Sequence, residues 1–401
     1  MTQPRSALAL ISLIFLAAGC EHLTGPSARP AWKEIPLDQR VTDAYTDFGF
    51  ELFRQTRSES PDGNVFVSPT SAAFALAMTW NGAAGRTADE MAEVLGVAHL
   101  DRATVNATNR TWLDALRQTR EPKAELAVAN SIWYRSDQRL VPAFRERVSS
   151  HYGAEIAEIT DAAAINRWVG GATRGRIDKV IETIPGNVTV YLINAVYFKA
   201  DWTKPFRESD TRPGPFHLPN GSTVSVPMMS QSGAFEIRSD AEMTMLRLPY
   251  GTGRFSMLFA LPKPGSTLDD IAGSLDGATW RRWMTEFAAV PRLQIEVPKF
   301  EVEWESSLVE SLQRMGMEAP FLPGQADFSG MFENGELWVD DVFQKTFLRV
   351  DEKGSEAAAV TVVVGVDSAP PSLVFDRPFF LAIYDHATST VLFLGQVTDP
   401  S

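Results

Sequence analysis

Side chains that could carry out catalysis are present in this chain, but their spacing matches no catalytic or metal-binding pattern. There is no Gly-x-Ser-x-Gly nucleophile elbow and no Gly-x-x-x-x-Gly-Lys phosphate loop. The only cysteine, Cys20, excludes an internal disulfide and a zinc site built from cysteines. We therefore expect no enzyme activity, no cofactor and no metal ion, because none of the five histidines has metal-ligand spacing either: His22, His99, His151, His217 and His386.

Two further patterns have ordinary structural interpretations. The adjacent acids Asp340 and Asp341 are expected to be solvated carboxylates in a loop. Gly251-Thr-Gly253 is similar to part of a dinucleotide-binding loop, but it leads into the strand-like run that starts at Phe255. A turn is therefore the better prediction for these glycines, because a dinucleotide loop must lead into a helix.

Composition and charge restrict the class of partner. The chain has 401 residues, of which 44% are hydrophobic and 22% are charged, so it can bury a large core. Its net charge is −13 and its acidic residues are spread out, which argues against nucleic acid as a partner. Helix and strand patterns are mixed after residue 37 without a visible linker or repeat, which predicts one α+β domain.

Apolar periodicity and capping residues place the helices of this domain. Residues 38–57 carry apolar side chains at helical spacing, and Ser68-Pro69 precedes an apolar run typical of a second helix. Thr87 and Glu90 form a Thr-x-x-Glu capping box, which predicts the start of a third helix. Residues 308–315 predict a helix near the end of the chain.

The strand patterns predict a central sheet. Val190–Phe198 is a nearly continuous apolar run with β-branched and aromatic residues, which is typical of a strand buried on both faces. Shorter strand patterns follow at residues 224–229, 245–248, 255–261, 293–297 and 391–397.

The most unusual segment runs from residue 352 to residue 371. Lys353-Gly354 is typical of a hinge, and no proline occurs from Ser355 to Ala369, although Pro370 and Pro371 follow. Proline cannot donate to a β-ladder, so a run without it can form a central strand. At about 3.3 Å per residue, residues 355–368 could add a strand about 45 Å long.

The two faces of this potential strand differ. One face carries Glu356 and several valines, whereas the other carries only uncharged and mostly small side chains. The uncharged face could enter a packed interior without burying a charge. Taken alone, a β-branched run of this kind is more typical of a resident strand of the sheet. The uncharged face consists of Ser355, Ala357, Ala359, Thr361, Val363 and Gly365.

The first residues resemble a bacterial lipoprotein signal. Arg5 precedes an apolar run, Ala7 to Ala18, which is too short to span a bilayer as a stable helix. Leu16-Ala-Ala-Gly-Cys20 is similar to a lipobox, although Ala17 stands where a larger apolar residue is usual. The resemblance implies a signal peptide at residues 1–19, a lipidated Cys20, and a flexible tether to residue 36.

An ordinary secretory signal with an incidental cysteine is the alternative. The lipoprotein interpretation predicts a protein of the bacterial cell envelope that is anchored to a membrane after export, with the extracellular face as one option. Residues 37–401 then form the working domain.

Several long motifs resemble those of the serpins, the serine protease inhibitor family. Val350-Asp-Glu-Lys-Gly-Ser-Glu-Ala-Ala-Ala359 is similar to the hinge of the serpin reactive loop. Phe375-Asp-Arg-Pro-Phe379 and the run Val391 to Val397 are similar to the segments that follow that loop. Further motifs occur in family order across residues 38–399, at 64–71, 166–169, 192–199 with Trp202, and 328–331.

The resemblance implies a serpin fold of three β-sheets with eight or nine helices and an exposed reactive loop. It also implies a monomer that does no chemistry itself. A target serine protease cleaves the loop, and an acyl-enzyme forms on the protease. The hinge then inserts as a new central strand, which distorts the protease before the ester is hydrolysed. The alternative within the family is a serpin that does not inhibit and acts as a surface binding protein.

The resemblance also assigns roles to individual residues. Lys299 is expected to pair with Glu352, and Gln344 departs from the family pattern because many members have a histidine there. Glutamine can also donate and accept hydrogen bonds, so we expect altered stability rather than loss of function. The hinge comprises Glu352, Gly354, Ser355, Ala357, Ala359 and Thr361, and the region that opens for it comprises Ser68, Ser71, Asn194, Trp202, Lys299 and Gln344.

Two counts place the bond that a protease would cleave. Counting from the hinge places it at Ser368-Ala369, and counting back from the downstream motif places it at Asp367-Ser368. Insertion length is the stricter constraint, so we favour the first. The small side chains nearby and the lack of arginine and lysine between 354 and 376 favour an elastase-like or subtilisin-like target. Cleavage after Asp367 would instead require a protease that prefers acidic residues.

Overall fold

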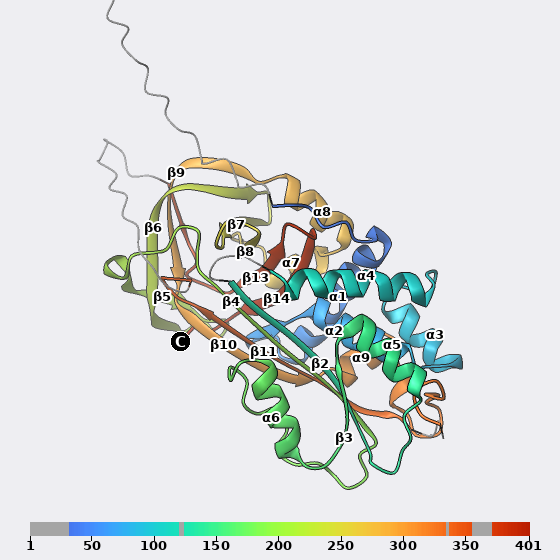
Figure 1. Ribbon diagram of the computed structural model, residues 1–401. Coiled ribbons are helices and arrows are strands. Elements are labelled where there is room, and N and C mark those ends of the chain that lie inside the picture. Colours follow the sequence, from blue (N-terminus) through green and yellow to red (C-terminus); the bar gives the residue numbers. More distant parts are fainter. Residues whose placement is uncertain (1–31, 120–123, 334–336, 355–370) are drawn as a thin grey trace, which may run out of the picture.

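The computed structural model describes residues 32–119, 124–333, 337–354 and 371–401, and the predictions for Cys20 and for residues 355–370 lie outside them. These residues form an α+β fold in which helices surround two hydrogen-bonded sheets (Figure 1). Nine α-helices occur within the described ranges. They are α1 Gln39–Glu59, α2 Pro69–Trp80, α3 Gly85–Val94, α4 Arg102–Arg117, α5 Pro142–Tyr152, α6 Ala162–Ala172, α7 Leu268–Ser274, α8 Gly277–Thr285 and α9 Val309–Arg314.

The smaller sheet has five strands. The neighbouring strands β11 and β4 run parallel to each other, whereas the pairs β10–β11 and β4–β2 are antiparallel. The short strand β3 continues the sheet parallel to β2. In spatial order the strands are β10 Phe300–Ser307, β11 Val339–Val350, β4 Val190–Ala200, β2 Ala124–Tyr134 and β3 Glu155–Glu158.

The larger sheet has two parts that meet where β6 and β9 change register between Gly233 and Phe235. Its strands, in the order of the main path, are β1 Val65–Val67, β14 Thr390–Val397, β13 Phe379–Asp385, β8 Phe255–Pro262, β7 Met243–Pro249, β6 Thr223–Ser239, β9 Ala288–Pro298 and β12 Ser372–Val374, with β5 Arg212–His217 beside β6.

Strand β4 is buried on both faces, as its continuous apolar run predicts. One face lies toward α6, and Ile193 on this face belongs to the same separate apolar cluster as Ile165 and Val169 of α6. The other face packs against α2, whose twelve residues are all buried. A helix that is apolar all round belongs in the interior of a domain, and here it supports the middle of the five-stranded sheet.

Most predicted elements are present with small shifts of their ends. The pattern at residues 38–57 is α1, which starts after Asp38, whose side chain accepts the Arg40 backbone N–H. The pattern at 308–315 is α9, and Gly251 and Gly253 form the predicted turn before β8. Within the described residues no helix is both long enough and apolar enough to cross a membrane.

The capping-box prediction is wrong. Helix α3 starts at Gly85, so Thr87 lies inside it rather than at its N-cap. The Thr87 hydroxyl accepts the Asp327 backbone N–H, and the Glu90 carboxylate accepts the backbone N–H groups of Glu318 and Ala319. Both side chains therefore hold a distant segment instead of capping their own helix.

The interpretation of Asp340 and Asp341 as loop carboxylates is also wrong. Both residues lie in strand β11 and are partly buried. The Asp341 carboxylate accepts the Ser307 hydroxyl and the Val342 backbone N–H, and burial raises the pKa of Asp341 above its ordinary value. Local sequence missed this because the pairing partners of β11 are far away in the chain.

Candidate functional site

The 355–370 segment joins the two sheets. It follows β11 after a four-residue turn, Asp351 to Gly354, and it ends just before β12, which pairs with β9 in the larger sheet. The predicted site residues Ser355, Ala357, Ala359, Thr361, Asp367, Ser368 and Ala369 all lie in this segment, outside the described residues. The site is therefore built from the attachment of the segment and from the strands beside it.

Glu352 is the best-held residue at the base of the segment. Its carboxylate lies 3.0 Å from Lys299 Nζ, which is the expected pairing, and it accepts the Thr211 hydroxyl at 2.8 Å. Burial acts to raise the pKa of Glu352, but its backbone N–H, Lys299 and Thr211 together lower that pKa overall. The carboxylate is therefore charged at neutral pH and fastens the turn to the residue before β5 and to the residue after β9.

Trp202 holds the other side of the turn. Its indole N–H donates to the Asp351 carbonyl at 2.9 Å, and its backbone N–H donates to the Lys353 carbonyl at 3.2 Å. The ring stacks on Tyr250 at a centroid distance of 4.2 Å. Gly354 has φ 65°, and a Cβ there would lie 2.2 Å from the Trp202 nitrogen, so only glycine fits this position.

The parallel pair of β4 and β11, here called the β4–β11 seam, runs from Val190 and Val339 to Tyr197 and Phe347. Gln344 and Asn194 are register partners at its centre. The Gln344 amide donates to the Asn194 side-chain oxygen at 2.6 Å and to the Ser68 carbonyl at 3.0 Å, and its oxygen accepts the Ser68 N–H at 2.9 Å.

The contacts of Asn194 and Ser68 extend this buried polar cluster. Asn194 donates to the Ser71 hydroxyl and to the Asn130 side-chain oxygen on β2. The Ser68 hydroxyl donates to the Leu392 carbonyl on β14, so Ser68 precedes α2 without capping it through its side chain. All five side chains are at most 2% exposed. One cluster thus connects β2, β4 and β11 to the start of α2.

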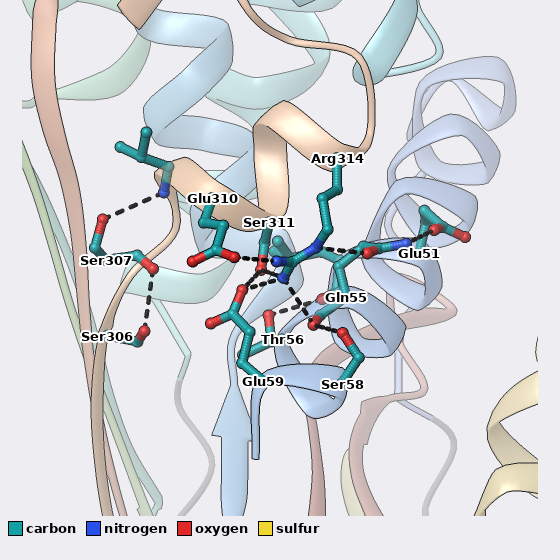
Figure 2. Close-up of polar contacts among 12 residues, drawn as sticks. Glu51, Gln55, Thr56, Ser58, Glu59, Ser306, Ser307, Glu310, Ser311 and Arg314 are labelled. Carbon is teal, nitrogen blue, oxygen red and sulfur yellow. Dashed lines mark hydrogen bonds and ion pairs between the residues drawn. The ribbon is translucent and has the colours of Figure 1, made fainter. Parts of the chain in front are cut away.

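A second polar network positions the connection between β10 and β11. Figure 2 shows Arg314 of α9 between side chains of α1 and of its own helix. Its guanidinium donates to Glu310 at 2.6 Å and to Gln55 at 3.0 Å, and it also pairs with Glu59. Glu59 accepts the Ser311 hydroxyl at 2.7 Å as well. The network fastens α9, and with it the β10–β11 side of the seam, to α1.

The comparison with known families decides the identity. The family model described as "Serpin (serine protease inhibitor)" matches residues 43–400, which is most of the chain. The chain is a serpin. Plasminogen activator inhibitor 1 of Neovison vison is 30% identical to it over 405 residues, covering 97% of this chain and 100% of that protein.

Other relatives come from distant organisms. An uncharacterized serpin-like protein of Thermococcus kodakarensis is 35% identical over 376 residues, covering 90% of this chain and 86% of that protein. Among solved structures, the thermophilic serpin tengpin in its native state is 29% identical with a TM-score of 0.83, covering 92% of this chain and 96% of its own. The fold and the family therefore agree across sequence and structure.

The structure brings the predicted opening residues of this serpin into two groups. Ser68, Ser71, Asn194 and Gln344 meet in the buried cluster. Trp202 and Lys299 lie instead at the turn that carries Glu352 and Gly354. No group of three or more histidine, cysteine, aspartate or glutamate side chains that could hold a metal ion occurs in the part of the chain that the structure describes.

Sequence reasoning missed two buried polar residues, Asn130 on β2 next to the seam and Thr346 on β11 within it. Asn130 accepts from Asn194, and the Thr346 hydroxyl donates to the Phe66 carbonyl on β1. Both are almost fully buried, but neither stands out in the sequence, because β2 and β11 carry other polar residues such as Ser131 and Gln344.

Proposed function

We propose that this serpin inhibits serine proteases by trapping an acyl-enzyme. The protease serine attacks the carbonyl of Ser368, or of Asp367 if the bond lies one residue earlier. The peptide bond to the next residue breaks, its nitrogen leaves with a proton, and an ester joins the serpin to the protease. The segment from Ser355 onward then inserts between β4 and β11. Relatives named plasminogen activator inhibitor 1 and leukocyte elastase inhibitor support an inhibitory role.

The parallel arrangement of the seam is the observation that carries this proposal. A strand that turns back from the end of β11 is antiparallel to β11, and it is antiparallel to β4 as well because those two strands are parallel. Insertion therefore replaces one parallel ladder by two antiparallel ladders. The gain in backbone hydrogen bonds provides the free energy that holds the protease.

The attachment of the segment supports an insertion that begins at the end of the seam next to Glu352 and Gly354. Gly354 lies in the left-handed region next to Trp202, and Glu352 is fixed by Lys299. The turn is thereby held, and the first residue that must enter the sheet is Ser355. Its face of the strand is uncharged, so its burial requires no partner for a charge.

A panel of serine proteases tests the proposal. We expect a covalent complex that survives denaturing electrophoresis with elastase-like or subtilisin-like enzymes and none with trypsin through this loop. Mass spectrometry of the released C-terminal peptide identifies the bond, with a start at Ala369 or at Ser368 as the two expected outcomes. Cleavage without any covalent complex across the panel contradicts inhibition and favours a serpin that acts as a surface binding protein.

We also propose that the mature protein is a monomer anchored to a membrane of the bacterial cell envelope through lipid on Cys20. The sequence pattern at residues 16–20 supports this localisation. Full-length protein is expected to fractionate with membranes, and protein that starts at residue 21 is expected to be soluble. Lipid and membrane association that persist in Cys20→Ser would overturn the anchor.

A further inference from the structure

The β4–β11 seam contains a β-bulge at its lower end, which is the end farthest from the turn at Asp351 to Gly354. The end next to that turn is called the upper end. Val339 pairs with Val190 and Asp341 pairs with Tyr191, so Asp340 is an extra residue on β11 without a partner of its own on β4. Such a bulge re-aims the extra side chain and interrupts the ladder locally. Here it directs the Asp340 carboxylate across the seam toward the start of β4.

One carboxylate oxygen of Asp340 accepts hydrogen bonds from Thr189, the residue before β4, and from Val190 at the start of β4. Its Oδ2 accepts the Thr189 backbone N–H at 2.5 Å, the Val190 backbone N–H at 2.9 Å and lies 2.8 Å from the Thr189 hydroxyl. The other oxygen accepts the Trp338 indole N–H at 3.1 Å. Thr189 is fully buried, so its N–H depends on this carboxylate rather than on water.

Insertion of a strand must break these contacts. Neighbouring strands lie about 4.8 Å apart, so a strand placed between β4 and β11 doubles their separation to about 10 Å. A carboxylate on β11 cannot bridge that distance to backbone groups of β4. Asp340 therefore holds together the two strands that insertion separates.

The contacts lie at the end that insertion reaches last. In an inserted strand that follows the turn at Asp351 to Gly354, Ser355 would fall opposite Val350, the last residue of β11. Strand β11 has twelve residues, whereas Ser355 to Ser368 has fourteen. An inserted segment therefore passes the upper and central parts of the seam before its final residues reach Asp340.

We propose that Asp340 is a latch on the final stage of loop insertion. It leaves the first stage unaffected and slows completion, so it sets how much of the acyl-enzyme is trapped before hydrolysis. Asp340 acts as a positioning residue that holds β4 against β11, not as a group that touches the protease. This inference rests on the proposed inhibitory function.

The adjacent Asp341 is a matched control. It is also a partly buried carboxylate on β11, but it accepts the Ser307 hydroxyl of β10 and the N–H of Val342. Insertion does not separate β10 from β11. Loss of the Asp341 carboxylate should therefore disturb the sheet without changing the lower end of the seam.

Peptide uptake by the mature protein tests the latch. Two labelled synthetic peptides are used, one with the sequence of residues 355–362, which reaches only as far as Phe343, and one with the sequence of residues 355–368. We expect Asp340→Ala to accelerate uptake of the long peptide about tenfold or more, as for loss of charge-assisted hydrogen bonds at a barrier, and to leave the short peptide unchanged. Asp340→Asn keeps an acceptor without the charge and should lie between wild type and Asp340→Ala.

Each outcome has a defined meaning. Equal acceleration of both peptides, no acceleration of the long one, or the same length dependence in Asp341→Ala overturns the latch. Failure of wild type to take up either peptide overturns the proposed insertion itself. Because Asp340→Asn retains the size of the side chain, a difference between the peptides in that variant separates the latch from general loss of stability.

Discussion

Gln344 shows how one side chain affects the centre of the seam. It is 1% exposed, and its neutral amide joins β11, β4 and the residue before α2 through three hydrogen bonds. A neutral group of this kind is insensitive to pH. The contribution of the cluster to stability should therefore be constant across the range in which histidine titrates.

Gln344→His should make that contribution depend on pH. Burial disfavours the charged imidazole, so its pKa in the native protein should fall below the ordinary value of about 6.5. The unfolded chain then binds more protons in this range, so stability is full above about pH 6.5 and is lost as pH falls toward the native pKa. Thermal unfolding of both proteins between pH 5 and 8 measures this, and parallel pH profiles would exclude it.

Gly354 is the residue on which the base of the loop depends most strictly. Gly354→Ala adds a Cβ that lies 2.2 Å from the Trp202 nitrogen and forces a non-glycine residue to φ 65°. The left-handed backbone conformation of an alanine should lower the free energy of unfolding by about 1 kcal/mol. The clash with Trp202 should lower it by about 1–3 kcal/mol more. We expect a lower midpoint of thermal unfolding for the native protein.

Gly175→Ala is the control for the backbone term alone. Gly175 has φ 74° and nothing within 4 Å of an added Cβ. The Gly175→Ala variant should therefore be destabilised only by the cost of the left-handed conformation. Equal unfolding midpoints for the two variants would show that the contact with Trp202 contributes nothing.

At the scale of elements, β11 is held differently on its two sides. On one side, α9 and β10 fasten it to α1 through Arg314 and Glu59. On the other side, the seam with β4 is held by the polar cluster at Gln344 and by Asp340. Opening the seam therefore leaves the β10–β11 side attached to α1 and separates it from β4 and β2.

Ser355→Arg tests which face of the segment enters the opened seam. Ser355 lies on the uncharged face, so an arginine there would be buried without a partner at the first step of insertion. Such a charge costs several kcal/mol, which is enough to slow that step by orders of magnitude. Hydrolysis of the acyl-enzyme should then be faster than insertion, so the protease should cleave the variant as a substrate. The number of serpin molecules consumed per protease molecule inhibited measures this.

Glu356→Arg is the matched control on the opposite face. That position already carries a charge, so arginine there should leave the number of serpin molecules consumed close to that of wild type. Unchanged trapping by Ser355→Arg would contradict the assignment of the two faces.

At the scale of the whole molecule, the proposed insertion implies that the native protein is not in its most stable state. An inserted strand would add a sixth strand to the five-stranded sheet and exchange one parallel ladder for two antiparallel ones. The native form is then held by a kinetic barrier rather than by equilibrium. On the proposed mechanism, the contacts at Gln344, Asp340 and Lys299 contribute to that barrier.

Cleavage of the loop should therefore raise thermal stability sharply. Limited proteolysis between residues 366 and 370 releases the end of the segment, and insertion then buries its valines and pairs its backbone groups. Calorimetry of intact and cleaved protein measures the change. Equal melting temperatures would show that the cleaved loop does not join the sheet.

Much of this protein could be predicted from the sequence because the informative patterns are local. The mostly apolar run of β4, the amphipathic spacing of α1 and the hinge motif from Val350 to Ala359 each lie within a few turns or one strand. The mixture of elements predicted an α+β fold, and the motifs predicted the serpin family. The absence of catalytic spacing followed equally from the sequence alone.

Tertiary structure decided which polar side chains meet. Asp340 and Thr189 are 151 positions apart, and their contact depends on a bulge in a ladder between two distant strands. Thr87 left its predicted capping role because the backbone of Asp327 packs against α3 and offers an N–H that needs an acceptor. A side chain takes the partner that burial leaves unsatisfied, and that partner is known only once strands far apart in the sequence have paired in register.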